Sequence, residues 1–90
     1  MKYIVTEDEN GIKEIFTFPR SDSHDCMAEV LSFIKNHKQT GWKRIHRDPV
    51  SAGFVNIDGE CFGRSESLNL KSSPDEDTAL FEETFNEFSY

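Results

Sequence analysis

Hydrophobic and polar positions alternate in two stretches of the chain, and each alternation is interrupted by a turn dipeptide. In the first stretch, "KYIVTEDENGIKEIFTFP", the dipeptide is Asn10-Gly11. It favours a two-residue hairpin loop, because both central positions of that loop require positive φ. Such a loop would pair Tyr3 with Phe18 and Val5 with Phe16, so we expect these four side chains to share the core face of a sheet.

The second stretch, "VSAGFVNIDGECFGR", repeats the pattern around Asp58-Gly59. A two-residue loop here would place Ile57 opposite Glu60 and Val55 opposite Phe62. The sequence therefore predicts a second antiparallel hairpin.

The segments around the second hairpin add weaker signals. Gly53 and Gly63 indicate a bulge or a close approach of two backbones. A short strand is expected in "WKRIHR", just before Pro49, and residues 64–72 fit either a further short strand or an ordered loop.

Between the hairpins the hydrophobic spacing changes to the i, i+3, i+4, i+7 pattern of a buried helical stripe. The stripe consists of Met27, Val30, Leu31 and Ile34. We expect this helix to run from Ser23 to Lys38, because cations suit the negative end of the helix dipole and Gly41 stands where a C-terminal glycine commonly ends a helix.

A second helix is predicted at the end of the chain. Ser73 can cap it, Pro74 suits its first position, and Glu76 stands three residues after the cap, which is the pattern of a capping box. The expected order is therefore ββαβββα, an α+β fold in which one central helix packs on an antiparallel sheet built from two hairpins and a short strand. Residues 1–73 form the predicted domain, and 74–90 form an acidic, Phe-bearing helix or tail.

Charge is distributed unevenly along the 90 residues. The chain has 17 Asp and Glu against 10 Lys and Arg, a formal net charge of −7, and residues 75–90 contain acids and no base. Acids mixed with aromatics are typical of segments that fold on a partner, but an ordinary terminal helix that completes the core fits equally well. The candidate protein-binding residues are Phe81, Phe85, Phe88, Glu82 and Glu83. If this segment docks on its own domain, we expect it near residues 35–47.

Five of the ten cations lie in "KNHKQTGWKRIHR", residues 35–47, with no acid among them. An aromatic flanked by cations can stack on bases and follow a phosphate backbone, which makes nucleic-acid binding the alternative function. Its candidate residues are Trp42, Lys43, Arg44, His46 and Arg47. We favour a simpler interpretation, in which these cations follow a helix C-terminus and protect a sheet edge.

Nothing in the sequence indicates catalysis. Cys26 and Cys61 are best interpreted as packed free thiols, and no nucleophile elbow, phosphate-binding glycine loop or metal-ligand cluster is present. We therefore expect no catalytic residue, no cofactor and no metal site. The first residues turn polar after Val5, and no apolar run approaches the ~20 residues of a membrane helix, so we expect neither a signal peptide nor a membrane span.

Three segments, "KEIFTFPRS", "HDCMAEVLSFIK" and "PVSAGFVNIDGECFGRSESLNLKS", resemble a group of small uncharacterised proteins of tailed bacteriophages and prophages. The resemblance covers roughly residues 1–80, and the acidic segment after Leu80 departs from it. It implies a phage or bacterial cytoplasmic setting but no activity, cofactor or site residue. Together these observations predict a non-enzymatic accessory protein of the bacterial cytoplasm that acts by binding another protein.

Overall fold

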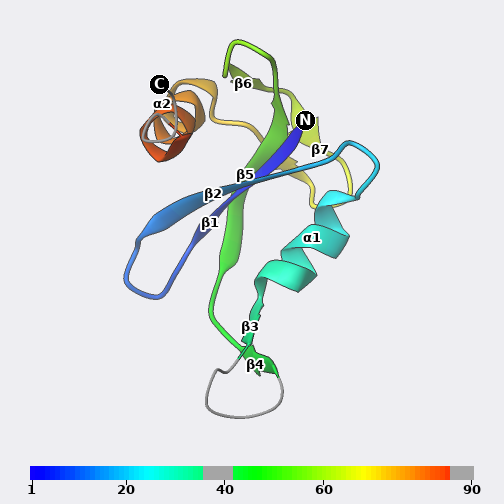
Figure 1. Cartoon of the computed structure of the whole chain (residues 1–90), viewed down its shortest axis with the longest axis vertical. Coiled ribbons are helices and arrows are strands. Elements are labelled where there is room, and N and C mark those ends of the chain that lie inside the picture. The colour runs from blue at the N-terminus through cyan, green and yellow to red at the C-terminus, as the bar shows by residue number, and fades with distance from the viewer. Residues whose placement is uncertain (36–41, 86–90) are drawn as a thin grey trace.

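The computed structural model describes residues 1–35 and 42–85. Its centre is a four-stranded antiparallel sheet of strand order β2-β1-β5-β6 (Figure 1). These strands are β1 (Lys2–Glu7), β2 (Lys13–Phe18), β5 (Asp48–Val55) and β6 (Cys61–Phe62). Two helices, α1 (His24–Leu31) and α2 (Pro74–Phe85), complete the α+β fold that the sequence predicts.

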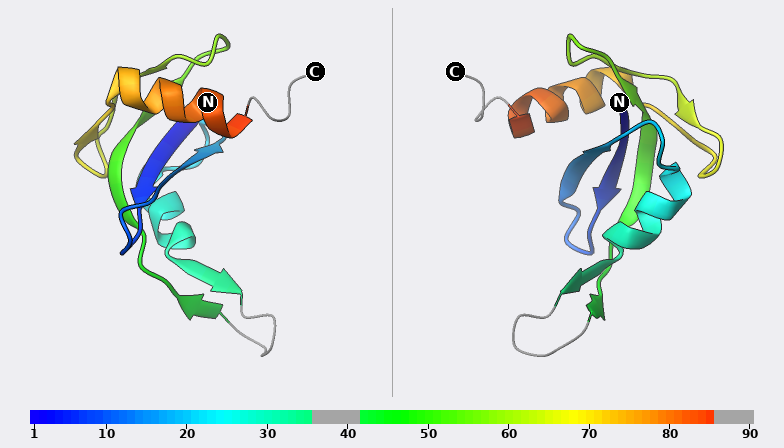
Figure 2. Two further views of the ribbon diagram at one scale, coloured as in Figure 1. Left: turned by 90° about the vertical axis from the view of Figure 1, so that its left-hand side faces the viewer. Right: turned by 45° about the vertical axis from the view of Figure 1, so that its right-hand side comes forward.

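Two small ribbons extend from this sheet. One pairs β3 (Phe33–Lys35) with β4 (Trp42–Arg44) and projects away from the body as an arm (Figures 1 and 2). The other pairs β7 (Arg64–Ser65) with β8 (Leu70–Lys71), so the segment 64–72 is a strand pair rather than a loop. Within the described ranges, no helix is long and apolar enough to cross a membrane.

Both hairpins lie where the sequence predicts them, but each is shifted by one residue from the expected register. Val5 pairs with Ile15 rather than with Phe16, and Val55 pairs with Cys61 rather than with Phe62. A shift of one residue moves every side chain of a strand to the other face of the sheet. The predicted grouping of Tyr3 and Val5 with Phe16 and Phe18 is therefore wrong.

The cause of the shift is an Asx side chain at the start of each turn. The Asp8 carboxylate accepts hydrogen bonds from the backbone N–H groups of Asn10 (2.9 Å) and Ile12 (3.0 Å), and Gly11 has a φ of 78°. In the second hairpin, Asn56 Oδ1 accepts the equivalent bonds from Asp58 and Glu60, and Gly59 has a φ of 82°. Each turn thus begins at an Asx residue and ends at a left-handed glycine three residues later, which is longer than a two-residue loop.

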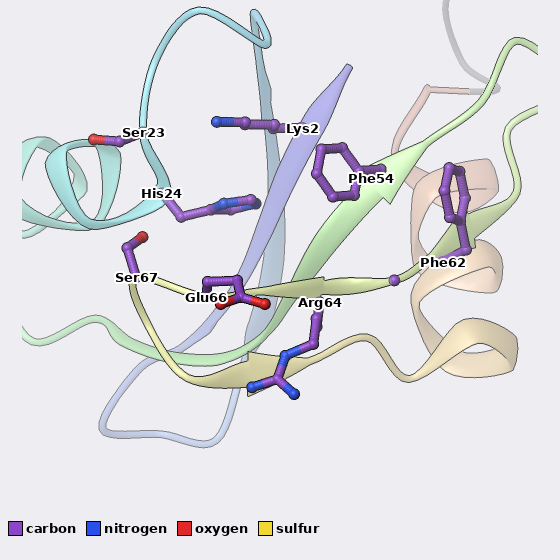
Figure 3. Close-up of a pocket in the computed structure, with 9 residues that line it drawn as sticks. Lys2, Ser23, His24, Phe54, Phe62, Arg64, Glu66 and Ser67 are labelled. Carbon is purple, nitrogen blue, oxygen red and sulfur yellow. The ribbon is translucent and has the colours of Figure 1, made fainter.

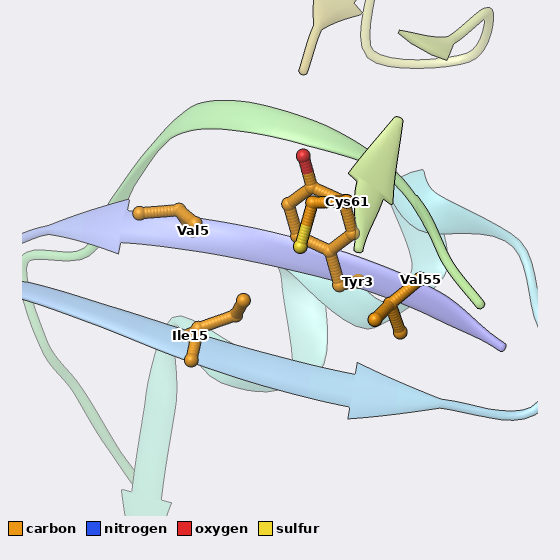
Figure 4. Packing of buried hydrophobic residues seen from close by; sticks show 5 residues of the cluster. All are labelled: Tyr3, Val5, Ile15, Val55 and Cys61. Carbon is orange, nitrogen blue, oxygen red and sulfur yellow. The ribbon is translucent and has the colours of Figure 1, made fainter. Parts of the chain in front are cut away.

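The observed register places hydrophobic side chains on both faces of the sheet. On one face, Leu80, Phe81 and Phe85 of α2 pack on a cluster that Figure 4 shows: Tyr3, Val5, Ile15, Val55 and Cys61. On the other face, α1 packs on Ile4, Phe18 and Ala52. The sheet therefore lies between two helices (Figure 2), where the sequence predicted one packed helix and an uncommitted terminal segment.

Helix α1 ends at Leu31, about two turns earlier than predicted. The Ser32 hydroxyl donates to Glu29 O (2.6 Å), and such local bonds compete with helix continuation. Phe33 and the next two residues then form β3, because they pair with β4. The helix C-terminus is instead contacted by Arg47, whose Nη1 donates to Leu31 O at 2.9 Å.

A buried acid fastens α2 to the sheet. Asp77 is 3% exposed, and its carboxylate accepts hydrogen bonds from Tyr3 Oη (2.5 Å), Ser51 Oγ (2.9 Å) and the Ser73 backbone N–H (2.9 Å). Burial and the nearby carboxylate raise the pKa of Tyr3 far above its ordinary value. The residue that reaches back to Ser73 is thus Asp77, not the predicted Glu76, which lies 3.8 Å from Lys13 Nζ.

Candidate binding groove

A groove opens on the side of the sheet opposite α2. It has a volume of about 560 Å³ and is formed where the start of α1, the ends of β5 and β6, and the β7–β8 ribbon meet (Figure 3). Its lining residues are Lys2, Ser23, His24, Phe54, Phe62, Gly63, Arg64, Glu66 and Ser67. We call it the Phe54–Phe62 groove.

Two phenylalanines provide its apolar surface. Phe54 and Phe62 are cross-strand partners whose rings stack with centroids 5.9 Å apart, and Phe62 is 49% exposed. A large half-exposed aromatic ring next to another one is unusual on a folded domain unless it serves binding.

Two glycines shape this surface. A Cβ atom on Gly53 would lie 2.3 Å from Phe62 O, so the close approach that the sequence indicates is confirmed there. Gly63 has a φ of 80°, and a Cβ atom on it would lie 3.1 Å from the Phe54 ring. The chain can therefore leave β6 and enter β7 only with glycine at this position.

His24 forms the inner wall of the groove. It is 4% exposed, its ring meets Phe18 and Phe54 edge to face, and its Nε2 lies 3.0 Å from Gly53 O. Because a carbonyl oxygen only accepts, this contact requires Nε2 to carry the proton. Burial lowers the pKa of His24, which keeps the ring neutral. The side chain is thus a packed, hydrogen-bonded wall of the groove.

Cations surround the two rings. Lys2 and Arg64 line the groove with a single acid, Glu66, and the Arg20 guanidinium lies 5.5 Å from the Phe54 ring centroid. Arg64 stands directly opposite Lys71 in the β7–β8 ribbon. Like charges in that position destabilise a strand pair. These cations have exposed partners within the chain, since Arg64 Nη2 donates to Asn69 Oδ1 (3.2 Å) and Lys2 Nζ donates to Asp22 O (2.8 Å). An anionic ligand would have to replace such bonds to bind here.

Three of the predicted nucleic-acid residues contact other parts of the chain, although Arg44 and His46 stay exposed. Among those whose side chains are described, Arg44 lies over the Phe33 ring and 3.7 Å from Glu29, and His46 Nε2 is 3.0 Å from Asp48. Arg47 lies over the Phe16 ring in addition to its bond to α1.

Only the backbones of Trp42 and Lys43 are described, in β4. Residues 36–41, and with them part of the basic segment, lie outside the described residues. The intramolecular partners of Arg44, His46 and Arg47 agree with a structural use of these side chains.

Some of the predicted protein-binding residues are packed in the core, and others are exposed. The Phe81 and Phe85 rings contact each other at a tilt of 41°, with centroids 4.7 Å apart, and pack on the core. Glu82 and Glu83 are exposed on the outer side of α2. The helix thus docks on β2 and β6 rather than near residues 35–47, because its aromatic edge covers the Tyr3 face of the sheet. Phe88 lies outside the described residues.

The two cysteines are free, and neither lies in the groove. Cys61 is buried against α2, and burial raises the pKa of its thiol to about 11, which opposes formation of a thiolate nucleophile. Cys26 is exposed on α1, so the expectation that it is a packed thiol is wrong.

Sequence reasoning named none of the residues of the groove as a site. Its walls come from four segments far apart in the chain, and the only signals that pointed to it were Gly53 and Gly63. Comparisons of the chain with protein-family models, with curated proteins and with solved structures give no match.

Proposed function

We propose that the protein is a non-enzymatic binding protein, and that the Phe54–Phe62 groove receives an acidic segment of another protein that also carries apolar side chains. The observation that supports this most is the half-exposed Phe62 next to Arg64 in the lining of the groove, with Lys71 opposite Arg64 in the β7–β8 ribbon. An apolar ligand side chain would cover the Phe62 ring, and a carboxylate would replace the exposed Arg64–Asn69 hydrogen bond with a stronger, charge-assisted one.

An extended protein segment suits the groove better than a compact small molecule. The cations do not gather at one point: Lys2 and Arg64 lie on opposite sides of the groove (Figure 3), and Arg20 lies over the Phe54 ring. Successive side chains of an extended chain point in opposite directions. A peptide with alternating acidic and apolar residues can therefore contact the cations with one set of side chains and the two rings with the other.

Nucleic-acid binding through residues 42–47 stays the alternative. A phosphate backbone would also be attracted by cations, but Arg44, His46 and Arg47 already have partners within the chain. The resemblance to small phage and prophage proteins adds the biological setting to the proposal, namely the cytoplasm of a bacterial host, and two free cysteines suit that reducing compartment.

The test is a fluorescence-polarisation titration of the full chain with a labelled peptide that alternates Asp or Glu with Leu or Phe. We expect saturable binding that weakens with salt. Arg64→Glu and Phe62→Ala should each reduce affinity at least about fivefold, as expected for central contact residues.

Matched controls exist for both changes. Arg44→Glu alters the net charge equally on the β3–β4 arm, and Ile57→Ala removes a fully exposed apolar side chain from the β5–β6 turn. Both should bind like the wild type. Absence of peptide binding at millimolar concentration, or an equal loss in Arg44→Glu and Arg64→Glu, would refute the groove as the site. Tighter binding of single-stranded DNA, lost in Arg44→Glu, would instead support the alternative.

A further inference from the structure

Strand β2 is an outer strand of the sheet. It pairs with β1 on one side, and no described strand pairs with its other side (Figure 2). Natural sheets usually protect such an edge with charged side chains, proline, a bulge, a very short strand or a covering helix or loop. The charged residues of β2, Lys13 and Glu14, both lie at its start, and α2 packs on its face. Strand β2 has six residues, contains no proline and pairs with β1 without a register shift.

The hydrogen-bond pattern of the first hairpin shows which main-chain groups of β2 face outward. Asp8 N–H donates to Ile12 O at 3.0 Å, so this is a hydrogen-bonded pair. Along an antiparallel ladder, hydrogen-bonded pairs alternate with pairs that have no mutual hydrogen bonds. Glu14, Phe16 and Phe18 therefore bond toward β1. The N–H and C=O groups that face outward belong to Lys13, Ile15 and Thr17.

These three positions are symmetric about Ile15. Consider an antiparallel pair of two β2 strands in which Ile15 lies opposite Ile15 of the second copy. In this register Lys13 of each copy lies opposite Thr17 of the other. It is the only register in which all three outward positions find a partner, and no like charges face each other in it. We propose that the protein forms a twofold dimer through antiparallel pairing of β2 with β2 of a second copy.

Side-chain charges favour a second copy over an unrelated strand. In this register Glu14 lies opposite Phe16 of the second copy, in a pair without mutual hydrogen bonds, where side chains come closest. The Arg47 guanidinium lies 5.1 Å from the Phe16 ring centroid within each chain. Glu14, which is exposed, would thus meet the second copy's Arg47, and the twofold axis makes the contact twice.

The test is the molar mass of the full chain in solution, measured by sedimentation equilibrium over a range of concentrations. We expect a monomer–dimer equilibrium. Thr17→Pro removes an outward N–H without touching a bond to β1, and should weaken the dimer at least tenfold. Glu14→Lys opposes Arg47 and should weaken it several-fold, whereas Glu60→Lys, the same change on the other hairpin, should not.

Hydrogen exchange gives an independent readout on the wild type. The amides of Lys13, Ile15 and Thr17 should exchange fast in dilute solution and become protected as concentration rises, because only the dimer bonds them. A monomer at millimolar concentration would contradict the proposal. So would a dimer that keeps these amides exposed, or that Thr17→Pro and Glu14→Lys leave unchanged.

Discussion

Phe81 and Phe62 lie on opposite faces of the sheet near the same turn, and they have different environments. Phe81 packs on the core cluster under α2, and its ring contacts the position of Gly59. Phe62 is half-exposed at the end of a two-residue strand, next to like-charged residues. The α2 face thus has its polar and apolar groups buried within the chain, while the groove face keeps a half-exposed ring, and its cations Lys2 and Arg64 make only exposed hydrogen bonds, to Asp22 O and Asn69 Oδ1.

This difference indicates which surface of a small domain should be tested for binding. A terminal segment rich in acids and aromatics suggests a partner-binding tail, but Asp77 and the aromatic edge of α2 make it part of the core. The binding surface is better sought where exposed rings and unbalanced charges remain after folding. Substitutions of Asp77, under α2, and of His24, in the groove wall, test one face each.

The largest expected effect concerns the α2 face. Asp77→Ala would leave the Tyr3 hydroxyl, the Ser51 hydroxyl and the Ser73 N–H without their buried acceptor, and should lower the free energy of unfolding by about 3 kcal/mol. Urea denaturation measures it. Asp75→Ala, an exposed acid in the same first turn, should cost about 0.5 kcal/mol. Equal effects of the two substitutions would show that the buried network contributes nothing beyond the helix dipole.

A smaller effect concerns the inner wall of the groove. Burial lowers the pKa of His24 in the folded state from the ordinary value of 6.5, so the unfolded chain takes up a proton first as pH falls. Stability should therefore be complete above pH 6.5 and decline below it toward the lowered folded pKa, by at most about 1.4 kcal/mol per pH unit.

The measurement is the free energy of unfolding of wild type and His24→Gln across this range. Glutamine keeps a donor for Gly53 O but does not titrate. The free energy of unfolding of His24→Gln should therefore fall less steeply below pH 6.5 than that of the wild type. Parallel curves for the two proteins would show that His24 is solvated rather than packed.

Local patterns predicted the elements well, because their causes are local. Asn10-Gly11 and Asp58-Gly59 marked both turns, and Ser73-Pro74 marked the start of α2. The registers were missed because the side chains of Asp8 and Asn56, not the glycine dipeptides alone, define these turns.

Other errors have causes that a local pattern does not contain. The predicted helix through Lys38 ignored the pairing of β3 with β4, a contact between segments separated in the chain. The groove was missed because Lys2, Phe54 and Arg64 are brought together only by the sheet order and by the turn at Gly63. Charge clustering along the sequence pointed instead to residues 35–47.

NMR can show whether the groove face is the binding face. Backbone amide shifts of the isotope-labelled full chain would be followed while the acidic–apolar peptide is added. We expect the largest shift changes at Phe54, Phe62, Gly63 and Arg64, and no change at the α2 residues Ala79 and Glu83. Changes concentrated on α2 or on Arg44 and its neighbours would contradict this expectation.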